Sequence, residues 1–457
     1  MLAQALLAVA LIPVAVVASN EFNPLHHSGP VSPYFDAPSQ DGIATDTPAG
    51  CTVDQAAYIL RHGSRFPELG SFAGWQALYA KFQNSSYTAE GPLAFIPSWV
   101  PPVDDAPHEP LYLSSTGALE AFSLGVDLRK RYKFTKGGEN ITIWSAGQQR
   151  VLDTATYFTR GYLSQGNYLT APSSNRGTII SLPDSVNYTF ANSLTPSSGC
   201  PNYSSGDRGS ATSTAYRATY QNTTAKRLNQ YLDGLTLDAT DIGVMQDLCG
   251  FQAEVDGDTR FCDVFEESEW LDYEYAHDLN YYYGSGPGNP YSATVGFPWV
   301  KAVSDLFALG PNQSTPGGNI TPPALIMGFT HDNNLPPIIS ALGLWNTSAA
   351  HGRLSCAAPP AHKVTHVAGA APQNLATQAY VRVRVDRAPV AIPGCAEGPG
   401  ASCPLAAFTK YVDTARRAAA GDFVERCGLQ GVANATGDAT FFTVAPKDVQ
   451  EVLVGLN

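Results

Sequence analysis

An apolar run that ends in cationic side chains is the feature that most restricts the fold of this chain. Residues 56–60 (Ala-Ala-Tyr-Ile-Leu) have the length and composition of a buried strand, and Arg61, His62 and Arg65 follow them. Such side chains are costly to bury unless an anion compensates them. Guanidinium groups suit a phosphate, and a histidine can bind the phosphate or attack its phosphorus atom. The run therefore has two interpretations: a phosphate site, or a surface loop with ordinary basic residues.

Two further apolar runs end in a similar way. Residues 141–144 (Ile-Thr-Ile-Trp) lead to Arg150 at a predicted helix start, and residues 324–329 (Ala-Leu-Ile-Met-Gly-Phe) lead to His331 and Asp332. Basic groups beside helix amides at the carboxyl ends of strands suit an anion, and an aspartate can protonate a leaving oxygen. Taken singly, the arginine could be solvated and the His-Asp pair could form an Asx-type turn that caps a helix.

Length and charge restrict the class of protein. The 457 residues are 44% hydrophobic and 15% charged, which predicts a globular protein with one large domain or a domain carrying a sizeable insertion. The net charge of −13 argues against a nucleic-acid partner, because nucleic-acid binders usually carry a basic surface. An anionic substrate would therefore need locally focused positive charge.

The N-terminus predicts secretion. Residues 2–18 are almost wholly apolar and are followed by small residues, which is typical of a signal peptide over residues 1–19; a signal anchor is the alternative. No second apolar run of spanning length follows, so no membrane association is expected after cleavage. Nine Asn-x-Ser/Thr sites suit an extracellular glycoprotein, at Asn84, Asn140, Asn187, Asn202, Asn222, Asn312, Asn319, Asn346 and Asn434.

The cysteines favour disulfides over a metal site. There are eight of them, an even number, and none forms a Cys-x-x-Cys pair. Because eight cysteines allow 105 pairings, the sequence alone leaves their connectivity open.

Changes in composition predict the domain organisation. Residues 20–50 are rich in Pro, Ser, Asp and Gly and predict an extended surface arm. Residues 51–181 and 291–457 contain the strand-like runs and predict a discontinuous α/β domain, whereas residues 182–290 predict a mainly helical cap. Residues 380–392 alternate apolar and polar side chains, which is typical of a strand with one exposed face near a sheet edge.

Helical periodicity gives the remaining expected elements. A helix over residues 118–132 should begin at Thr116 as its N-cap. His277 and Asp278 lie inside a helical pattern with no preceding strand, so we interpret them as structural or surface residues. Other helices are predicted over residues 72–82, 151–162, 213–232, 266–283, 300–309, 337–344 and 405–420.

Residues 61–67 match the Arg-His-Gly-x-Arg-x-Pro signature of the histidine acid phosphatase family, and the chain resembles its fungal phytase-like branch. Arg150 matches the third arginine of that family, and His331-Asp332 matches its His-Asp element. The resemblance implies an α/β domain like that of the phosphoglycerate mutases, with a smaller helical domain over the active site. It covers most of residues 50–430.

The resemblance also implies roles for individual residues. His62 would attack phosphorus and form a phosphohistidine, and Asp332 would protonate the leaving alcohol. The phosphoryl oxygens would be held by Arg61, Arg65, Arg150 and His331, with no metal or cofactor. The implied disulfides are Cys51–Cys356, Cys200–Cys427, Cys249–Cys262 and Cys395–Cys403.

The implied function is that of a secreted acid phosphomonoesterase of phytase type, whose substrates include myo-inositol hexakisphosphate. The alternatives are a broad acid phosphatase with little phytate activity and a non-catalytic phosphate-binding relative. Two departures from the branch bear on this choice. Residues 68–80 contain no Lys or Arg, whereas phytate-preferring relatives carry lysines there, and the segment 345–356 is shorter than expected.

An acidic pH optimum is expected from the charges of the site. Three guanidinium groups should keep His62 neutral below its reference pKa of about 6.5. Asp332 must be protonated to donate, and an adjacent phosphate anion would raise its pKa.

Overall fold

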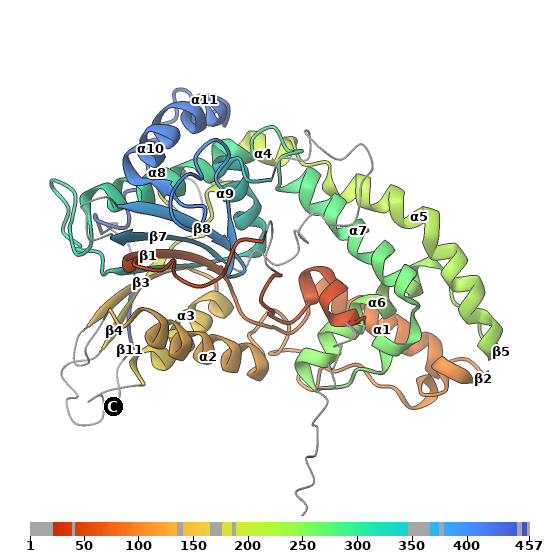
Figure 1. The fold of residues 1–457 in the computed structure, drawn as a ribbon. Coiled ribbons are helices and arrows are strands. Elements are labelled where there is room, and N and C mark those ends of the chain that lie inside the picture. The colour runs from red at the N-terminus through yellow and green to blue at the C-terminus, as the bar shows by residue number, and fades with distance from the viewer. Residues whose placement is uncertain are drawn as a thin grey trace, which may run out of the picture.

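A mixed nine-stranded sheet forms the centre of the computed structural model, which describes residues 22–38, 42–134, 140–164, 176–184, 189–345, 366–373, 379–445 and 450–454 (Figure 1). Its middle consists of four parallel strands in the order β1 (Thr52–Arg61), β6 (Leu325–Thr330), β3 (Ile141–Ala146) and β4 (Gly177–Leu182). Antiparallel strands flank them, namely β7 (His366–Gln373), β8 (Tyr380–Val385), β9 (Ala388–Val390), β10 (Cys403–Pro404) and β11 (Gln450–Val454). The carboxyl ends of the four parallel strands therefore lie at one edge of the sheet.

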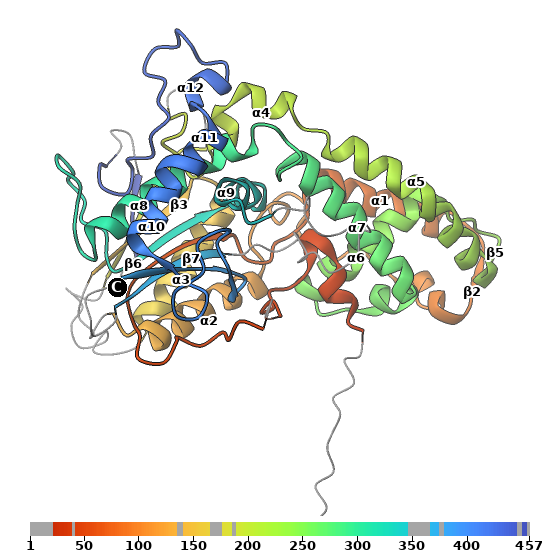
Figure 2. The ribbon, with the colours of Figure 1, turned by 45° about the horizontal axis from the view of Figure 1, so that its top comes forward.

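Helices cover both faces of the sheet (Figures 1 and 2). One face packs against α2 (Ser115–Tyr132) and α3 (Gln149–Leu163). The other face packs against α8 (Ser292–Leu309), α9 (Leu335–Leu342) and α10 (Leu405–Tyr411). Burial on both sides explains why the parallel strands are apolar along their length: residues 56–60 are at most 2% exposed and β6 is buried throughout.

The remaining elements are short. Two-residue strands pair as β2 (Thr88–Ala89) with β5 (Leu232–Asp233). The short helices are α4 (Pro201–Ser205), α11 (Arg417–Ala420) and α12 (Phe423–Arg426). Single turns of 3-10 or π helix occupy Pro24–His27, Gly29–Val31, Gly91–Leu93, Ile96–Ser98, Pro196–Gly199, Asn229–Tyr231, Arg260–Val264, Asp332–Asn334 and Val412–Arg416.

A helical cap lies beside the sheet, on the right of Figure 1. We define it as α1 (Leu69–Gln83), α5 (Gly209–Leu228), α6 (Ala239–Val255) and α7 (Glu267–Gly284). These helices share a hydrophobic cluster that contains Trp75, Trp99, Trp270 and Tyr273. Residues 72–99, which the sequence assigned to the α/β part, thus pack with residues 182–290. The predicted boundary differs because the chain leaves the sheet after β1 and returns to it only at α2.

The N-terminal arm is more buried than predicted. Residues 24–31 form two 3-10 turns rather than an extended surface segment. Ser28 is fully buried, and Val31 belongs to the hydrophobic cluster of the cap. Nδ1 of His27 lies 2.7 Å from Oε2 of Glu274 on α7. The expectation of a surface arm is wrong here because these residues pack against the cap helices.

The expectation that β8 exposes one face is also wrong. Arg382 and Arg384 alternate with buried valines, yet they are only 4% and 6% exposed. Nη1 of Arg382 donates to the carbonyl of Asp46 at 2.6 Å, and Arg384 donates to the carbonyl of Thr45. Arm residues therefore cover the polar face of β8, and their backbone carbonyls satisfy the guanidinium groups.

Three disulfides link described cysteines: Cys200–Cys427, Cys249–Cys262 and Cys395–Cys403. They are three of the four pairs that the family resemblance implied. Cys356 lies outside the described residues, so its pairing with Cys51 stays a prediction.

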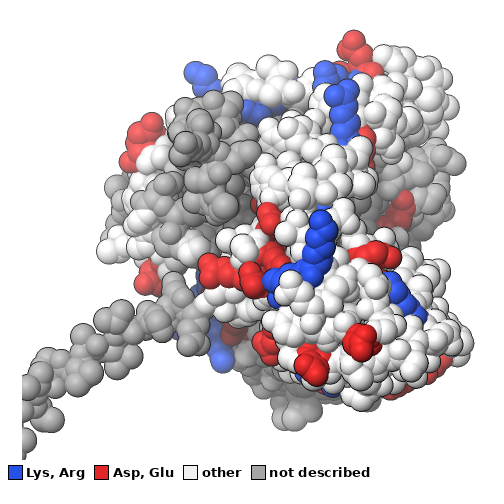
Figure 3. All heavy atoms as spheres, turned by 90° about the vertical axis from the view of Figure 1, so that its right-hand side faces the viewer, with Lys and Arg blue, Asp and Glu red and all other residues white. Residues whose placement is uncertain are grey.

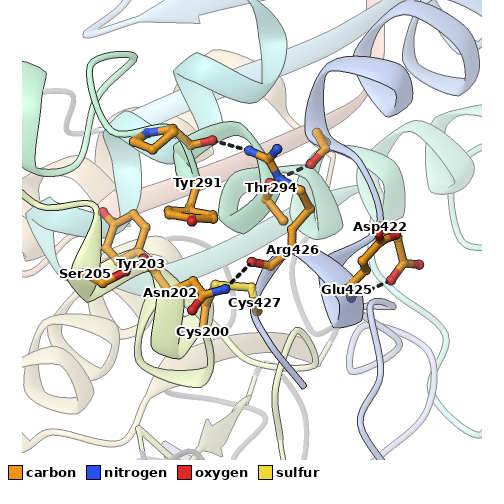
Figure 4. The surroundings of a disulfide bond; sticks show 12 residues. Cys200, Asn202, Tyr203, Ser205, Tyr291, Thr294, Asp422, Glu425, Arg426 and Cys427 are labelled. Atoms are coloured by element: carbon orange, nitrogen blue, oxygen red, sulfur yellow. Dashed lines mark hydrogen bonds between the residues drawn. A yellow bond between two sulfur atoms is a disulfide. The ribbon is translucent and has the colours of Figure 1, made fainter. Parts of the chain in front are cut away.

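Figure 4 shows that the Cys200–Cys427 bond joins the start of α4 to the end of α12. Nδ2 of Asn202 donates to the carbonyl of Arg426 at 2.9 Å beside this bond. The guanidinium of Arg426 in turn donates to the carbonyl of Pro290 at 2.5 Å. The C-terminal region is thus fastened covalently and by hydrogen bonds to the segments that precede α5 and α8.

Only some of the features that predict secretion lie within the described residues. Residues 1–19 and the sites Asn187 and Asn346 lie outside the described residues. Of the remaining Asn-x-Ser/Thr asparagines, Asn202 is half-buried and the other six are exposed. Among the helices that the structure describes, none is long and apolar enough to cross a membrane.

Removing the Cys200–Cys427 disulfide should destabilise the fold more than removing the Cys395–Cys403 disulfide. The bonded cysteines are 227 residues apart in the first case and 8 in the second, and the chain entropy that a cross-link removes grows with loop length. We expect losses of about 5 kcal/mol for Cys200→Ser/Cys427→Ser and about 2.5 kcal/mol for Cys395→Ser/Cys403→Ser. Denaturant unfolding measures both, and a reversed order would contradict the entropic explanation.

Candidate active site

The side chains that follow three neighbouring parallel strands lie together at the carboxyl edge of the sheet. His62 follows β1, His331 follows β6, and Arg150 lies in the first turn of α3, after β3. The ring centroids of His62 and His331 are 5.9 Å apart. Nη2 of Arg150 lies 3.4 Å from Nδ1 of His331. Basic residues predicted from three separate parts of the sequence therefore belong to one site.

Gly63 allows the loop after β1 to approach the helices closely. A Cβ atom at this position would lie 2.5 Å from the carbonyl oxygen of Gly117 on α2, which is closer than packed atoms allow. The amide of Gly63 donates to Oγ1 of Thr154 on α3 at 3.0 Å. These contacts fix the backbone beside His62, so the imidazole is held in place before any ligand binds.

Ser64 connects the same loop to the start of α2. Its amide and hydroxyl donate to Oε2 of Glu120 at 2.9 and 2.8 Å. Its carbonyl accepts from the hydroxyl of Ser114 at 2.9 Å. Ser114 also caps α2 by accepting from the amide of Gly117 at 3.1 Å, so the N-cap predicted at Thr116 is wrong. Ser114 therefore both caps α2 and holds the loop that follows β1.

His62 is a buried, neutral imidazole. Nδ1 lies 2.8 Å from the carbonyl oxygen of Gly63, so we assign the ring hydrogen to Nδ1 and a lone pair to Nε2. Burial lowers its pKa well below the ordinary value, and the charges of Arg61, Arg65 and Arg150 lower it further. The side chain is 5% exposed. A neutral ring with an available lone pair is what a nucleophile requires.

Two of the three arginines are held by neighbouring groups. Nη1 of Arg61 donates to the carbonyl of Pro30 in the arm at 2.5 Å, and its Nη2 lies 3.9 Å from Oδ2 of Asp332. Nη2 of Arg65 donates to Oε1 of Glu68 at 2.8 Å. Both guanidinium groups are thus oriented by the protein itself.

Hydrogen-bond donors nevertheless remain unused at the site. The Nε atoms of Arg61, Arg65 and Arg150 are buried and have no hydrogen-bond partner within the described part of the chain. Burial, followed by the charge of Arg65, lowers the pKa of Arg150 to about 10. Neighbouring guanidinium groups therefore repel one another, and a bound anion would relieve that repulsion.

Asp332 is ionised in the ligand-free site. Oδ2 accepts a hydrogen bond from the hydroxyl of Tyr281 on α7 at 2.5 Å, and Oδ1 accepts from the amide of Asn333 at 3.0 Å. Burial raises the pKa of Asp332, but the charge of Arg61 and the hydrogen bond from Tyr281 outweigh burial and hold it well below the ordinary value. Asp332 can therefore donate a proton only after the surrounding positive charge has been compensated.

Tyr281 and Asp184 are site residues that the sequence did not reveal. Tyr281 lies within the helix predicted over residues 266–283, but nothing local indicates that its hydroxyl reaches Asp332, 51 residues away. Asp184 follows β4, and its Oδ2 lies 3.8 Å from Nε2 of His331. The apolar run of β4 that ends in Pro-Asp was the available signal, since it resembles the three runs described above.

A cavity of about 350 Å³ adjoins the loop after β1. Its walls include Arg61, His62 and Arg65 from the loop, Val31 from the arm and Phe251 from α6. Arg150, His331 and Asp332 do not line this cavity, so it adjoins the site rather than containing it. The arm and the cap reach the site itself through the contacts of Pro30 with Arg61 and of Tyr281 with Asp332.

Other residues with possible metal or acid–base chemistry lie apart from this site. Nε2 of His277 lies 2.8 Å from Nη2 of Arg217, in accordance with the structural interpretation of that histidine. No group of three His, Cys, Asp or Glu side chains could hold a metal ion in the portion that the structure describes.

Comparisons with known proteins bear on the family and on the fold. The family model of the histidine phosphatase superfamily (branch 2) matches residues 52–377. A phytase of Candida albicans is 32% identical over 428 residues, which are 90% of this chain and 88% of that protein. An acid phosphatase of Komagataella pastoris is 29% identical over 445 residues, covering 93% and 90% of the two chains.

Solved structures show the same architecture. The phytase from D. castellii superimposes with a TM-score of 0.80 at 25% identity, covering 93% of each chain. A multiple inositol polyphosphate phosphatase of Bifidobacterium longum has a TM-score of 0.61 at 13% identity, which supports the fold alone. The predicted family and the predicted α/β fold are therefore confirmed. The chain belongs to branch 2 of the histidine phosphatase superfamily.

Proposed function

We propose that the protein is an acid phosphomonoesterase of phytase type that acts through a phosphohistidine on His62. One observation carries this proposal: a neutral His62, whose lone pair lies on Nε2, is surrounded by three guanidinium groups whose buried Nε atoms have no hydrogen-bond partner among the described residues. Such an arrangement suits phosphoryl transfer, which depends on positioning and charge neutralisation. The similarity to a phytase and an acid phosphatase supports the same chemistry.

The reaction has two steps. In the first, Nε2 of His62 forms a bond to phosphorus while the bond from phosphorus to the alcohol oxygen breaks, and Asp332 gives its proton to that oxygen. In the second, a water molecule attacks phosphorus, Asp332 takes a proton from the water, and the phosphorus–nitrogen bond breaks. Phosphate leaves and neutral His62 is restored. The other site residues, Arg61, Arg65, Arg150 and His331, hold the phosphoryl oxygens.

The charge of the substrate prepares Asp332 for its role. In the empty site the guanidinium groups keep this carboxyl ionised. A bound phosphoryl group compensates those cations and brings negative charge close to Asp332, and both effects favour its protonated form. The enzyme should therefore work best at acidic pH, where the bound complex can take up that proton.

A broad acid phosphatase with little phytate activity is the second candidate. Arg65 is bonded to Glu68, and residues 68–80 contain no Lys or Arg that could bind further phosphates. On the face of the cap in Figure 3, acidic and basic side chains are interspersed among uncharged ones over the described atoms. The attraction for a phosphate would then come mainly from the buried arginines, which recognise one phosphoryl group rather than six.

The proposal also covers the location of the protein and the roles of its domains. We assign a signal peptide to residues 1–19 and expect secretion, which suits three disulfides and six exposed glycosylation sites. In this proposal the α/β domain binds the phosphoryl group, the arm orients Arg61 through the carbonyl of Pro30, and the cap supplies Tyr281 beside the proton donor Asp332. A Cys51–Cys356 disulfide would close the base of β1.

Trapping of the phosphoenzyme with an alkaline quench tests the nucleophile. Brief incubation with a ³²P-labelled monoester should label the wild-type chain with an acid-labile, alkali-stable phosphate, as phosphohistidine requires. His62→Ala should carry no label, because the attacking nitrogen is gone. His277→Ala is the matched control and should label normally. Label retained by His62→Ala would contradict the proposed mechanism.

Kinetics on two substrates decide between the phytase and the broad phosphatase. Similar kcat/KM values for phytate and p-nitrophenyl phosphate are expected of a phytase, and much poorer turnover of phytate would assign the broad class. Glu68→Gln should raise kcat/KM for phytate by about two- to fivefold, because one exposed carboxylate near a polyanion is worth up to about 1 kcal/mol. Glu90→Gln, an exposed glutamate elsewhere, should change neither value.

The pH profile tests the contact between Tyr281 and Asp332. The hydrogen bond from Tyr281 stabilises the carboxylate, so Tyr281→Phe should raise the pKa of Asp332. Since the alkaline limb of kcat reports loss of the proton from the acid in the complex, that limb should move to higher pH by about one unit. Tyr283→Phe, the matched control, removes a tyrosine hydroxyl two residues further along the chain and should not shift the alkaline limb of kcat. A shift to lower pH in Tyr281→Phe would exclude Asp332 as the donor.

A further inference from the structure

Asp184 and His331 face each other through two atoms that lack hydrogen bonds. Oδ2 of Asp184 lies 3.8 Å from Nε2 of His331. Both atoms are buried, and neither has a hydrogen-bond partner among the residues that the structure describes. The separation exceeds that of an N–H···O hydrogen bond by less than about 1 Å, so a small rotation of either side chain would complete one.

The carboxylate of Asp184 is anchored on its other side. Oδ1 accepts from the amide of Gly147, at the end of β3, at 3.3 Å. The residue itself follows β4, the fourth parallel strand, so it reaches the site from the same edge of the sheet as His62, Arg150 and His331. Its place beside His331 is therefore set by strand order.

The contact between Arg150 and His331 assigns the hydrogen of the imidazole. A guanidinium nitrogen can only donate, so Nδ1 of His331, 3.4 Å from Nη2 of Arg150, is the acceptor. The neutral ring must then carry its hydrogen on Nε2, which faces Asp184. In the empty site His331 thus has a donor directed at a carboxylate and a lone pair directed at the arginines.

That arrangement presents a lone pair rather than a donor on the side of His331 that faces Arg150. When a phosphoryl group binds, Arg150 donates to it, and the lone pair on Nδ1 of His331 would then meet an oxygen lone pair. A proton on Nδ1 converts this repulsion into a charge-assisted hydrogen bond. The resulting imidazolium carries its second N–H on Nε2, where Asp184 can accept it.

We propose that Asp184 is a positioning residue that stabilises His331 as an imidazolium donor to the bound phosphoryl group. This inference rests on the proposed function of the site. The added proton comes from the acidic solvent on binding and returns to it when phosphate leaves, so His331 undergoes no net change in a turnover. Asp184 touches His331 and acts through it.

Several charged groups face His331 and bear on its protonation. Arg150 from α3 and His62 from the loop after β1 lie on the phosphate side, with ring centroids of the two histidines 5.9 Å apart. The adjacent Asp332 is engaged by Tyr281 and Arg61. Among the described residues, Asp184 is the carboxylate that lies at ion-pair distance from His331, so the removal of its charge tests the proposal directly.

Asp184→Asn tests the proposal because it keeps the shape of the side chain and an oxygen for the amide of Gly147. We expect kcat/KM for p-nitrophenyl phosphate to fall about tenfold, mainly through KM, as for loss of a charge-assisted hydrogen bond. The alkaline limb of kcat/KM should move to lower pH, because the imidazolium loses its proton earlier. Asp184→Glu keeps the carboxylate and should retain most of the wild-type kcat/KM. Asp153→Asn removes a carboxylate from α3 and should leave kcat/KM unchanged.

A double-variant comparison separates this role from a merely structural one. In a His331→Asn background, Asp184→Asn should cause little further loss, because its partner is already absent. The proposal is overturned if Asp184→Asn has the wild-type pH profile and KM, or if its effect persists in full without His331. Phosphoenzyme trapping on the same variants distinguishes this failure from that of the proposed function, since a wild-type chain without label would refute the latter alone.

Nuclear magnetic resonance on the wild-type protein gives a second measurement that needs no Asp184 variant to fold. With ring-¹⁵N histidine, and the signal of His331 assigned from His331→Asn, inorganic phosphate at acidic pH should convert both ring nitrogens to the protonated form. A ring that stays neutral with phosphate bound would overturn the proposal.

Discussion

Electrostatic repulsion among the guanidinium groups around His62 is the interaction on which the site depends. Burial, followed by the charge of Arg61, lowers the pKa of Arg65, and burial, followed by the charge of Arg65, lowers the pKa of Arg150. Burial and the three charges together hold the pKa of His62 well below its usual value. The same charges keep Asp332 ionised against the effect of burial. In the proposed mechanism, a phosphoryl anion would relieve this repulsion on binding. Affinity for the anion, the neutral state of His62 and the protonation of Asp332 would then have one common origin.

Holding like charges together requires support from the whole fold. Parallel strand order brings β1, β6, β3 and β4 to a single edge, where each strand is followed by a residue of the site. The carbonyl of Pro30 in the arm fixes Arg61, and Tyr281 in the cap fixes Asp332. Neither the sheet nor the cap alone contains a complete site, which explains why the arm packs between them instead of lying free.

The sequence predicts those parts of the site that have a local signal. Cationic residues after apolar runs identified His62, Arg150 and His331, because a buried strand with a charged end is unusual in itself. Tyr281 was not predicted because its partner lies 51 residues away and its helical surroundings carry no signal. Asp184 also has a distant partner, and the apolar run before it was the one signal that pointed to it.

Long-range packing also explains the errors in the predicted fold. The alternation of Arg382 and Arg384 with valines is typical of an exposed face, yet arm carbonyls bury both arginines. The helical period of residues 72–82 was recognisable, but it does not say that Trp75 packs with α6 and α7 rather than with the sheet. Propensity and periodicity identify an element, whereas its partner is chosen by the complete chain.

The disulfide between Cys200 and Cys427 has a consequence for biosynthesis. During translation Cys200 emerges with Cys249 and Cys262 soon after it, while its own partner follows only 227 residues later. Because thiolates exchange with whichever disulfide is accessible, an oxidising compartment exposes the nascent chain to mispairing within the cap segment. Any such mispaired bond would have to be exchanged after Cys427 has emerged, which is the reaction that disulfide isomerases catalyse.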